Sequence, residues 1–253
     1  MSANGAVEMT PLADTLHTMT ATDILKELKP LGSESYKRTM LRHGAQEPIY
    51  GVKIEELQKI RKRIIQDHQL ALDLFDTGVY DAMYLAGLIA DDLRMTKKDL
   101  TRWIKLAHSP TIAEYTVPWV AAEGKHGWEL GLEWIESKDE QIAAAGWATI
   151  CNVVSIKDDA DLDLPELKRL LARVQKTINE QPNRVRYGMN AFVISLGCYV
   201  QSLTEAALQA AAKIGKVEVD MGDTSCKVAS AAEYIKKVQA RGTIGKKRKT
   251  CKC

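Results

Sequence analysis

The sequence predicts an all-α protein, a right-handed-type solenoid of stacked antiparallel helix pairs that curves around a concave groove. Apolar residues recur at helical spacing along almost the whole chain, and signals for strands are nearly absent. A faint internal repeat supports the stacking, because LFDTGVYDAMYLAGLIA at 74–90 is similar to EWIESKDEQIAAAGWATI at 133–150. Each segment carries a glycine, Gly87 or Gly146, where neighbouring helices can pack closely. Stacked hairpins of this kind present a curved binding surface.

Two clear amphipathic helices are expected in the N-terminal half. Residues 53–66 place a stripe of apolar side chains on one helical face: Ile54, Leu57, Ile60, Ile64 and Ile65. Residues 96–107 begin with Thr96 and Asp99 at the spacing of a capping box and then present one apolar face.

The C-terminal half continues the helical pattern. Further helices are expected at 139–152, 163–180, 185–200, from Ser202 onward, and at 224–240. Pro165 falls in the first turn of its helix, where a missing N–H does no harm. The helix at 185–200 is apolar on nearly all sides and is therefore expected to be central. Residues 216–220 alternate like a strand but have no partner, so we expect an extended connector.

Three regions divide the chain. We expect a flexible lead-in at 1–21, a single repeat domain at 22–240 and a basic, disordered tail at 241–253. No apolar run approaches the roughly 18 residues that cross a bilayer, so no membrane partner is expected. Five cysteines without CxxC spacing indicate reduced thiols and a cytoplasmic protein, nucleoid-associated if bacterial. The histidines share no metal-ligand spacing. We expect a monomer that binds no metal and no small-molecule cofactor.

Basic residues are clustered although the net charge is only +2. Clusters at 36–42, 59–63, 183–186 and 245–252 fit an anionic partner, while solvated helix faces are the alternative. The candidate DNA-binding residues are Lys37, Arg38, Arg42, Lys53, Arg61, Arg63, Arg184, Arg186 and Asn190. Arg184 and Arg186 open a helix, where free N–H groups favour an anion. Asn190 shares the face of Arg186, and a capping network at the helix start is its alternative role.

The stretch YKRTMLRHGAQEPIYGVKIEELQKI at 36–60 resembles the N-terminal motif of the DNA alkylation-repair glycosylases built from HEAT-like repeats, the AlkD kind. The positions that carry the resemblance are Tyr36, Met40, Tyr50, Gly51, Val52 and Lys53. It extends over roughly 22–240. It implies a C-shaped solenoid that holds duplex DNA in a basic groove. Catalytic members of this family remove N3- or N7-alkylated purines, and an aspartate stabilises the positive charge that develops on the sugar.

The sequence departs from this family at the expected catalytic positions. The family pattern Trp-Asp-x-Val-Asp falls on Glu114–Pro118, where Val117 matches but Pro118 replaces the final aspartate. Ile194 stands near the position of a second groove tryptophan, and alanines at 143–145 stand where the family has an arginine. No residue is therefore assigned as catalytic by resemblance. Glu114 and Tyr115 remain as candidates for catalysis because they adjoin the aligned position.

Four aromatic residues are candidates for the groove. They are Tyr50, Trp119, Trp147 and Tyr187, with a place in the core as the alternative for the two tryptophans. Two functions remain open. The first is a DNA-binding protein of the alkylation-repair family, which excises alkylated purines if it is an enzyme. The second is a non-catalytic helical-repeat scaffold for a protein or RNA partner.

Overall fold

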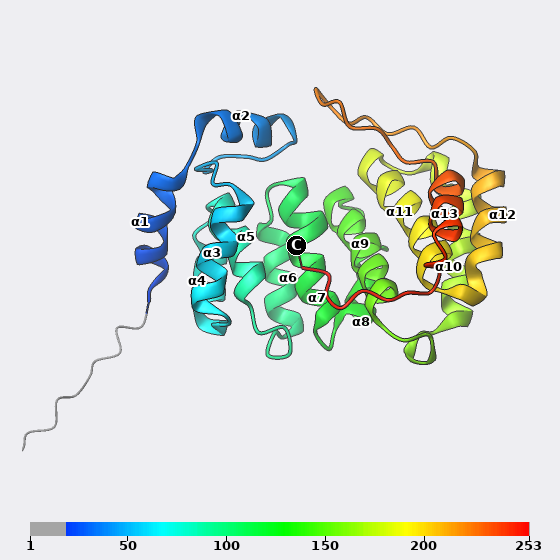
Figure 1. Cartoon of the computed structure of the whole chain (residues 1–253), viewed down its shortest axis with the longest axis horizontal. Coiled ribbons are helices and arrows are strands. Elements are labelled where there is room, and N and C mark those ends of the chain that lie inside the picture. The colour runs from blue at the N-terminus through cyan, green and yellow to red at the C-terminus, as the bar shows by residue number, and fades with distance from the viewer. Residues whose placement is uncertain (1–18, 253) are drawn as a thin grey trace, which may run out of the picture.

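The computed structural model describes residues 19–252 and confirms the all-α prediction. Within that range there is no strand, and one isolated bridge joins Gly32 to Val52. The helices, shown in Figure 1, are α1 (Ala21–Leu31), α2 (Glu34–Arg42), α3 (Ile54–Ile64), α4 (His68–Asp76), α5 (Tyr80–Ile89), α6 (Lys97–Leu106), a π-helical turn (Ile112–Thr116), α7 (Val117–Glu123), α8 (Gly127–Trp134), α9 (Glu140–Ile156), α10 (Leu164–Thr177), α11 (Asn183–Tyr199), α12 (Thr204–Ile214) and α13 (Ala231–Ala240). Most of the expected lead-in lies outside the described residues, and α1 begins at Ala21.

The helices stack in two rows, and this arrangement positions the site. α5, the π-helical turn with α7, α9 and α11 contact one another in that order and form an inner row. α4, α6, α8 and α10 each pack against an inner helix. The inner row is therefore continuous along the stack, and the outer helices cover one side of it. α2 and the segment after α12 project from the two ends of the arch (Figure 1). Among the described residues, no single helix could span a membrane by length and composition, although the bent pair Asn183–Tyr199 and Gln201–Ile214 could.

The two glycines of the internal repeat lie at close helix contacts, as predicted. A Cβ on Gly87 would stand 2.3 Å from the Thr116 methyl group, and a Cβ on Gly146 would stand 2.6 Å from the Ile135 backbone nitrogen. Real Cβ contacts are never this short, so any larger residue would push the helices apart. The faint repeat in the sequence therefore reflects tight packing.

Local signals also place the helix starts as expected. The Thr96 side chain accepts a hydrogen bond from Asp99 N at 3.1 Å, and the Asp99 carboxylate accepts one from Thr96 N at 3.1 Å. This reciprocal pair confirms the predicted capping box. Pro165 lies in the first turn of α10. All ten residues of α5 are buried, and most of α11 is buried, which confirms that the apolar helix at 185–200 is central.

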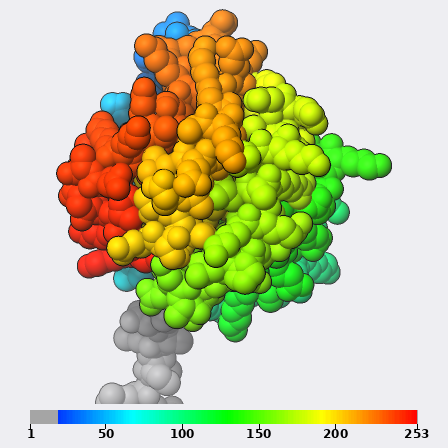
Figure 2. Space-filling view, turned by 90° about the vertical axis from the view of Figure 1, so that its right-hand side faces the viewer, coloured from blue at the N-terminus to red at the C-terminus, as the bar shows by residue number. Residues whose placement is uncertain are grey.

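Residues 215–230 form a projecting segment, which we call the arm. Asn183 holds its first limb, since its side chain accepts from Asp220 N at 2.7 Å and donates to Asp220 O at 2.9 Å. Asn190 holds its second limb by donating to Ala229 O at 2.9 Å. The expected connector at 216–220 is confirmed, but the last helix begins at Ala231 and not at 224, because these contacts keep the preceding residues extended. Figure 2 shows the arm (orange) rising above the C-terminal end of the molecule.

Residues 241–252, which we call the strap, lie against the stack and form hydrogen bonds with it, in contrast to the disordered tail expected for them. The strap donates to carbonyl groups near the C-terminal ends of inner-row helices: Gly245 N to Cys198 O (2.8 Å), Arg248 N to Ser155 O (2.8 Å), Lys247 Nζ to Val154 O (2.9 Å) and Lys252 Nζ to Ala90 O (3.3 Å). Helix C-termini leave carbonyl groups unpaired and carry partial negative charge, so a basic segment stabilises them. Figure 1 shows the strap (red) running from α13 to the middle of the stack.

Candidate nucleic-acid interface

The segment AEYTVPWVAAE at 113–123 lies in the inner row and continues as a helix through its proline. Residues Ile112–Thr116 form a π-helical turn, and Val117 N donates to Ile112 O. Pro118 then falls in the first turn of α7, where its missing N–H is tolerated. The wider π turn rotates the preceding side chains relative to α7. Tyr115 thereby becomes 42% exposed, while Glu114 is 7% exposed.

Glu114 forms a bidentate ion pair with Arg184 at the start of α11. The Arg184 Nε and Nη2 atoms donate to the two carboxylate oxygens at 2.7 and 2.6 Å. Burial raises the pKa of Glu114, and the Arg184 guanidinium opposes this shift. Two residues expected to serve different roles, a catalytic acid and a phosphate ligand, therefore neutralise each other.

Arg184 also joins three other parts of the interface. Its backbone N–H donates to the Glu140 carboxylate at 2.6 Å at the start of α9. Its guanidinium lies 4.6 Å from the centre of the Tyr187 ring, a cation–π contact. The same group approaches Met221 Sδ of the arm at 4.0 Å. These contacts hold the π-helical turn, α9, α11 and the arm in a fixed relation, which favours a structural role for Arg184.

A cavity of about 190 Å³ opens beside this ion pair, between the π-helical turn, α9 and α11. Its walls are aromatic, since Tyr115 and Tyr187 face it, and its remaining lining consists mainly of small side chains. Burial, and to a lesser extent the neighbouring Tyr187, raises the pKa of Tyr115, so its hydroxyl stays protonated at neutral pH. Tyr115 thus lines the cavity with its ring and a protonated hydroxyl group, and it does not act as a base for proton abstraction.

Several other predicted DNA-binding cations are engaged with carboxylates. Lys37 pairs with Glu47 at 2.7 Å, Lys53 with Glu55 at 3.7 Å and Arg63 with Glu27 at 2.5 Å. Arg61 donates to Gln58. By contrast, Arg38 and Arg42 lie one turn apart on α2, are exposed, and form no ion pair within residues 19–252. These two arginines are the available cations of the α2 surface.

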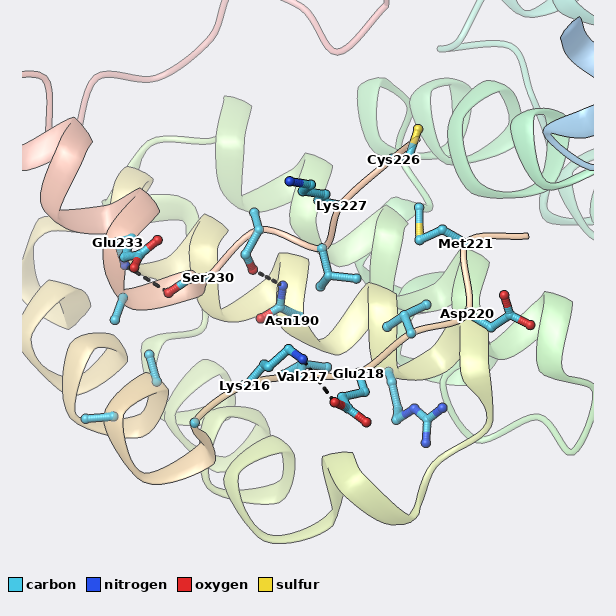
Figure 3. Close-up of a pocket in the computed structure, with 18 residues that line it drawn as sticks. Asn190, Lys216, Val217, Glu218, Asp220, Met221, Cys226, Lys227, Ser230 and Glu233 are labelled. Carbon is cyan, nitrogen blue, oxygen red and sulfur yellow. Dashed lines mark hydrogen bonds and ion pairs between the residues drawn. The ribbon is translucent and has the colours of Figure 1, made fainter. Parts of the chain in front are cut away.

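Arg186 and Asn190 lie beside a larger cavity of about 1080 Å³ beneath the arm. Figure 3 shows acids and bases around it, with Glu218 paired to Lys216 and with Asp220, Lys227 and Glu233 at other places on its lining. This mixture of charges gives no net preference for an anion. Asn190 is 5% exposed and donates to the Ala229 carbonyl, so it holds the arm from the middle of α11 and forms no capping network at the start of that helix.

The two tryptophans belong to the core and do not line the groove. Trp147 is fully buried, with its ring centre 5.2 Å from that of Phe192, and Trp119 is 4% exposed against Tyr84. The apolar helix faces that carry them are also the packing faces, which explains why spacing alone could not separate the two roles. Tyr50 is half-buried, and its backbone N–H, like that of Val52, is bound by a carboxylate of α5.

That carboxylate is Asp81, a buried residue that the sequence analysis missed. It accepts from Tyr50 N at 2.6 Å and from Val52 N at 2.8 Å. Gly51 between them has φ of +76°, and a Cβ there would stand 2.6 Å from Ser33 O. Burial raises the pKa of Asp81, and the backbone donors oppose the shift. An acid within an apolar helical run was the available signal, because such a group needs partners.

Metal and thiol chemistry find no support at this interface. Residues 19–252 contain no cluster of three or more His, Cys, Asp or Glu side chains that could hold a metal ion. Burial raises the pKa of Cys151 to about 12 and that of Cys198 to about 11, so both thiols stay protonated.

Known proteins resemble this chain over most of its length. The sequence model of a family described as DNA alkylation repair enzyme matches residues 24–235. The uncharacterised proteins Lin0241 of Listeria innocua and Lmo0209 of Listeria monocytogenes are each 32% identical over 221 residues, covering 85% of this chain and 95% of the relative. A solved structure superposes with a TM-score of 0.86 and 33% identity, covering 93% of this chain and 100% of the other. It is described as a new family of proteins related to the HEAT-like repeat DNA glycosylases with affinity for branched DNA structures.

Proposed function

The chain belongs to the DNA alkylation repair enzyme family and has its HEAT-like helical fold, and from this premise we propose that it binds branched DNA along its inner face without excising bases. The similar solved structure is described as related to glycosylases and as having affinity for branched DNA. The proposal places the chain among non-catalytic DNA-binding members of this fold.

We infer the absence of base excision from one observation, the Glu114–Arg184 ion pair. Breaking an N-glycosidic bond builds positive charge on the sugar, which a free carboxylate can stabilise. Glu114 is the carboxylate nearest to the position where the family has its aspartate. Both of its oxygens are bound by the Arg184 guanidinium, so its charge is neutralised. Pro118 offers no charge at the aligned position itself.

The α2 surface supports the DNA-binding part of the proposal. α2 has no buried residue, so its side chains project from the stack. The tip of the arm approaches it, since a Cβ on Gly222 would stand 3.9 Å from Arg42 O. The inner helices begin at the edge of the stack that lies below α2 and the arm (Figure 1). Arg38 and Arg42 therefore border the opening through which a phosphate backbone would pass.

The binding test compares Arg38→Gln/Arg42→Gln with a matched control, Lys98→Gln/Lys105→Gln, which removes two exposed cations from α6. Fluorescence anisotropy with a four-way junction and with a linear duplex gives affinities over a range of salt concentrations. We expect the α2 variant to bind the junction more weakly and to lower the salt slope by about two, because each lost phosphate contact contributes roughly 0.9. The control should leave both quantities near the wild-type values.

The excision test incubates the protein with alkylated duplex DNA and measures release of N3- and N7-methylpurines. We expect no release above the uncatalysed rate, together with salt-dependent junction binding. Release of either base would contradict the proposal. Absence of DNA binding, with capture of an RNA or protein ligand, would favour the helical-repeat scaffold. We also propose that the protein is cytoplasmic and monomeric. Size-exclusion chromatography with light scattering can test the oligomeric state.

A further inference from the structure

A shallow trough runs along the inner face between α9 and α11. It consists of the cavity beside the ion pair and a second cavity of about 190 Å³, and both are lined by Cys151, Asn152 and Ala191. Between its ends the lining is small and uncharged, including Ala148, Gly188 and Ser195. The trough is thus continuous, shallow and free of available carboxylates.

Each end of the trough combines tyrosines with an arginine. Tyr115 and Tyr187 form one end, where the Arg184 guanidinium covers the Tyr187 ring. Tyr199 and Tyr234 form the other end beside Arg248 of the strap. Tyr115 and Tyr234 are 42% and 49% exposed, so both rings are accessible to a ligand. Both ends therefore offer ring faces for stacking.

The strap adds positive charge at the end of the trough that Tyr199 and Tyr234 form. Lys246, Arg248 and Lys249 are exposed, and none forms an ion pair within residues 19–252. The strap is held in place by Lys247, which pairs with Asp159 at 2.8 Å, and by Lys252, which pairs with Asp92 at 2.8 Å.

Glu123 of α7 anchors the end of the strap. It accepts from Cys251 N at 2.6 Å and from the Thr250 hydroxyl. Lys247 and Lys252 thus fix the strap to the stack. The side chains of Lys246, Arg248 and Lys249 remain available on this fixed backbone. Pre-organised cations bind an anion with less loss of conformational entropy than cations on a flexible tail.

We propose that the trough binds an unpaired strand of the branched DNA, with bases between the two tyrosine ends and phosphates near the strap where it crosses the Tyr199–Tyr234 end. This rests on the proposed function and names the part of the DNA that the inner face selects. Tyr187 and Tyr199 are 12 positions apart on α11, or about 18 Å, which matches about five stacked nucleotides at 3.4 Å each. Basic surfaces interleaved with aromatic side chains are typical of single-strand binding.

The charge test uses Lys246→Gln/Arg248→Gln/Lys249→Gln. The matched control, Lys213→Gln/Lys236→Gln/Lys237→Gln, also removes three exposed cations, from α12 and α13. Two DNA probes are compared, a forked duplex with unpaired arms of about five nucleotides and a four-way junction in which every base is paired. We expect the strap variant to bind the fork at least tenfold more weakly and to lower its salt slope by about two, since each lost single-strand contact contributes roughly 0.7. Its affinity for the paired junction should change less than threefold.

The stacking test uses Tyr115→Ala and Tyr234→Ala, because both side chains are among the exposed large residues. With 2-aminopurine in the unpaired arm, wild-type protein should change the probe fluorescence, and each variant should reduce that change without altering the circular dichroism spectrum. Two results would refute single-strand binding in the trough: equal losses of fork and paired-junction affinity in the strap variant, or an unchanged 2-aminopurine signal. Neither result would contradict the proposed function. Failure of the wild type to bind either probe would overturn both.

Discussion

Replacement of Arg184 by glutamine gives a quantitative test of the buried ion pair. The change keeps a polar side chain of moderate size but removes both hydrogen bonds to Glu114, at 2.7 and 2.6 Å. It also removes the cation–π contact with Tyr187. The carboxylate of Glu114, whose side chain is 7% exposed, then remains buried without a compensating charge.

The magnitude follows from burial and charge. Removing one partner of a buried ion pair costs about 3–5 kcal/mol, because an uncompensated charge is left behind. The Arg184 side chain is 24% exposed, so water screens the pair in part and places the expected loss at the lower end, about 3 kcal/mol. Replacing both residues, as Glu114→Leu/Arg184→Met, should recover most of this loss, since apolar replacements of buried pairs are often nearly neutral.

The loss should depend on pH in a defined direction. Burial raises the pKa of Glu114 and Arg184 opposes this rise, so removing Arg184 raises the folded-state pKa further. A carboxyl group with a raised folded-state pKa stabilises the fold below its unfolded-state pKa and loses that contribution as pH rises through the folded-state value. The variant should therefore be close to the wild type near about pH 4 and show its full deficit near about pH 8.

Urea unfolding followed by circular dichroism measures both effects. The free energy of unfolding of the wild type, Arg184→Gln, the two single variants Glu114→Leu and Arg184→Met, and their double variant is compared at the two pH values, with the m-value checked for constancy. A coupling energy of about 2 kcal/mol or more at the higher pH supports the buried pair. A loss below about 1 kcal/mol, or a deficit that grows toward acid pH, would refute this reasoning.

Three further substitutions test other parts of the structure by the same unfolding assay. Gly51→Ala should cost more than about 1 kcal/mol, since φ is +76° and the new Cβ would meet Ser33 O at 2.6 Å, and an unchanged stability would contradict the turn. Trp147→Ala should cost about 3–5 kcal/mol, with junction affinity of the folded fraction unchanged, because the ring is fully buried, and a selective loss of DNA binding would instead make it a groove residue. Glu123→Ala should cost about 1–2 kcal/mol and expose the strap to proteases, and equal protease resistance would show that another contact anchors it.

Local features of the fold could be predicted because they depend on residues close in sequence. The capping box at Thr96 and Asp99 lies within one helical turn, and Leu57 and Ile60 of the predicted stripe at 53–66 are buried within α3. The ends of that stripe differ from the prediction, since Ile54 is 41% exposed and Ile65, which follows the helix, is 76% exposed. The repeat glycines were visible as a pair because the same packing recurs in two hairpins. The fold class and the family resemblance rest on such signals, and both are confirmed.

The site depends on contacts between distant residues, and it could be predicted only in part. Glu114 and Arg184 are 70 positions apart, and each looked functional by itself because nothing in the sequence shows that they meet. Glu123 and Cys251 are 128 positions apart, so a basic tail that caps inner-row helices looked like a solvated one. An acid inside an apolar segment and an arginine at the start of another apolar helix were the available signals for a buried pair.

One competition experiment tests most directly whether this inner face binds branched DNA without excision. Wild-type protein is bound to a labelled four-way junction at physiological salt and challenged with unlabelled junction or with linear duplex of equal length, and the recovered DNA, made with N7-methylguanine, is assayed for abasic sites. We predict that the junction competes at least tenfold better than the duplex and that abasic sites stay at the background level. Equal competition by the linear duplex, or abasic sites that accumulate with time, would contradict the account.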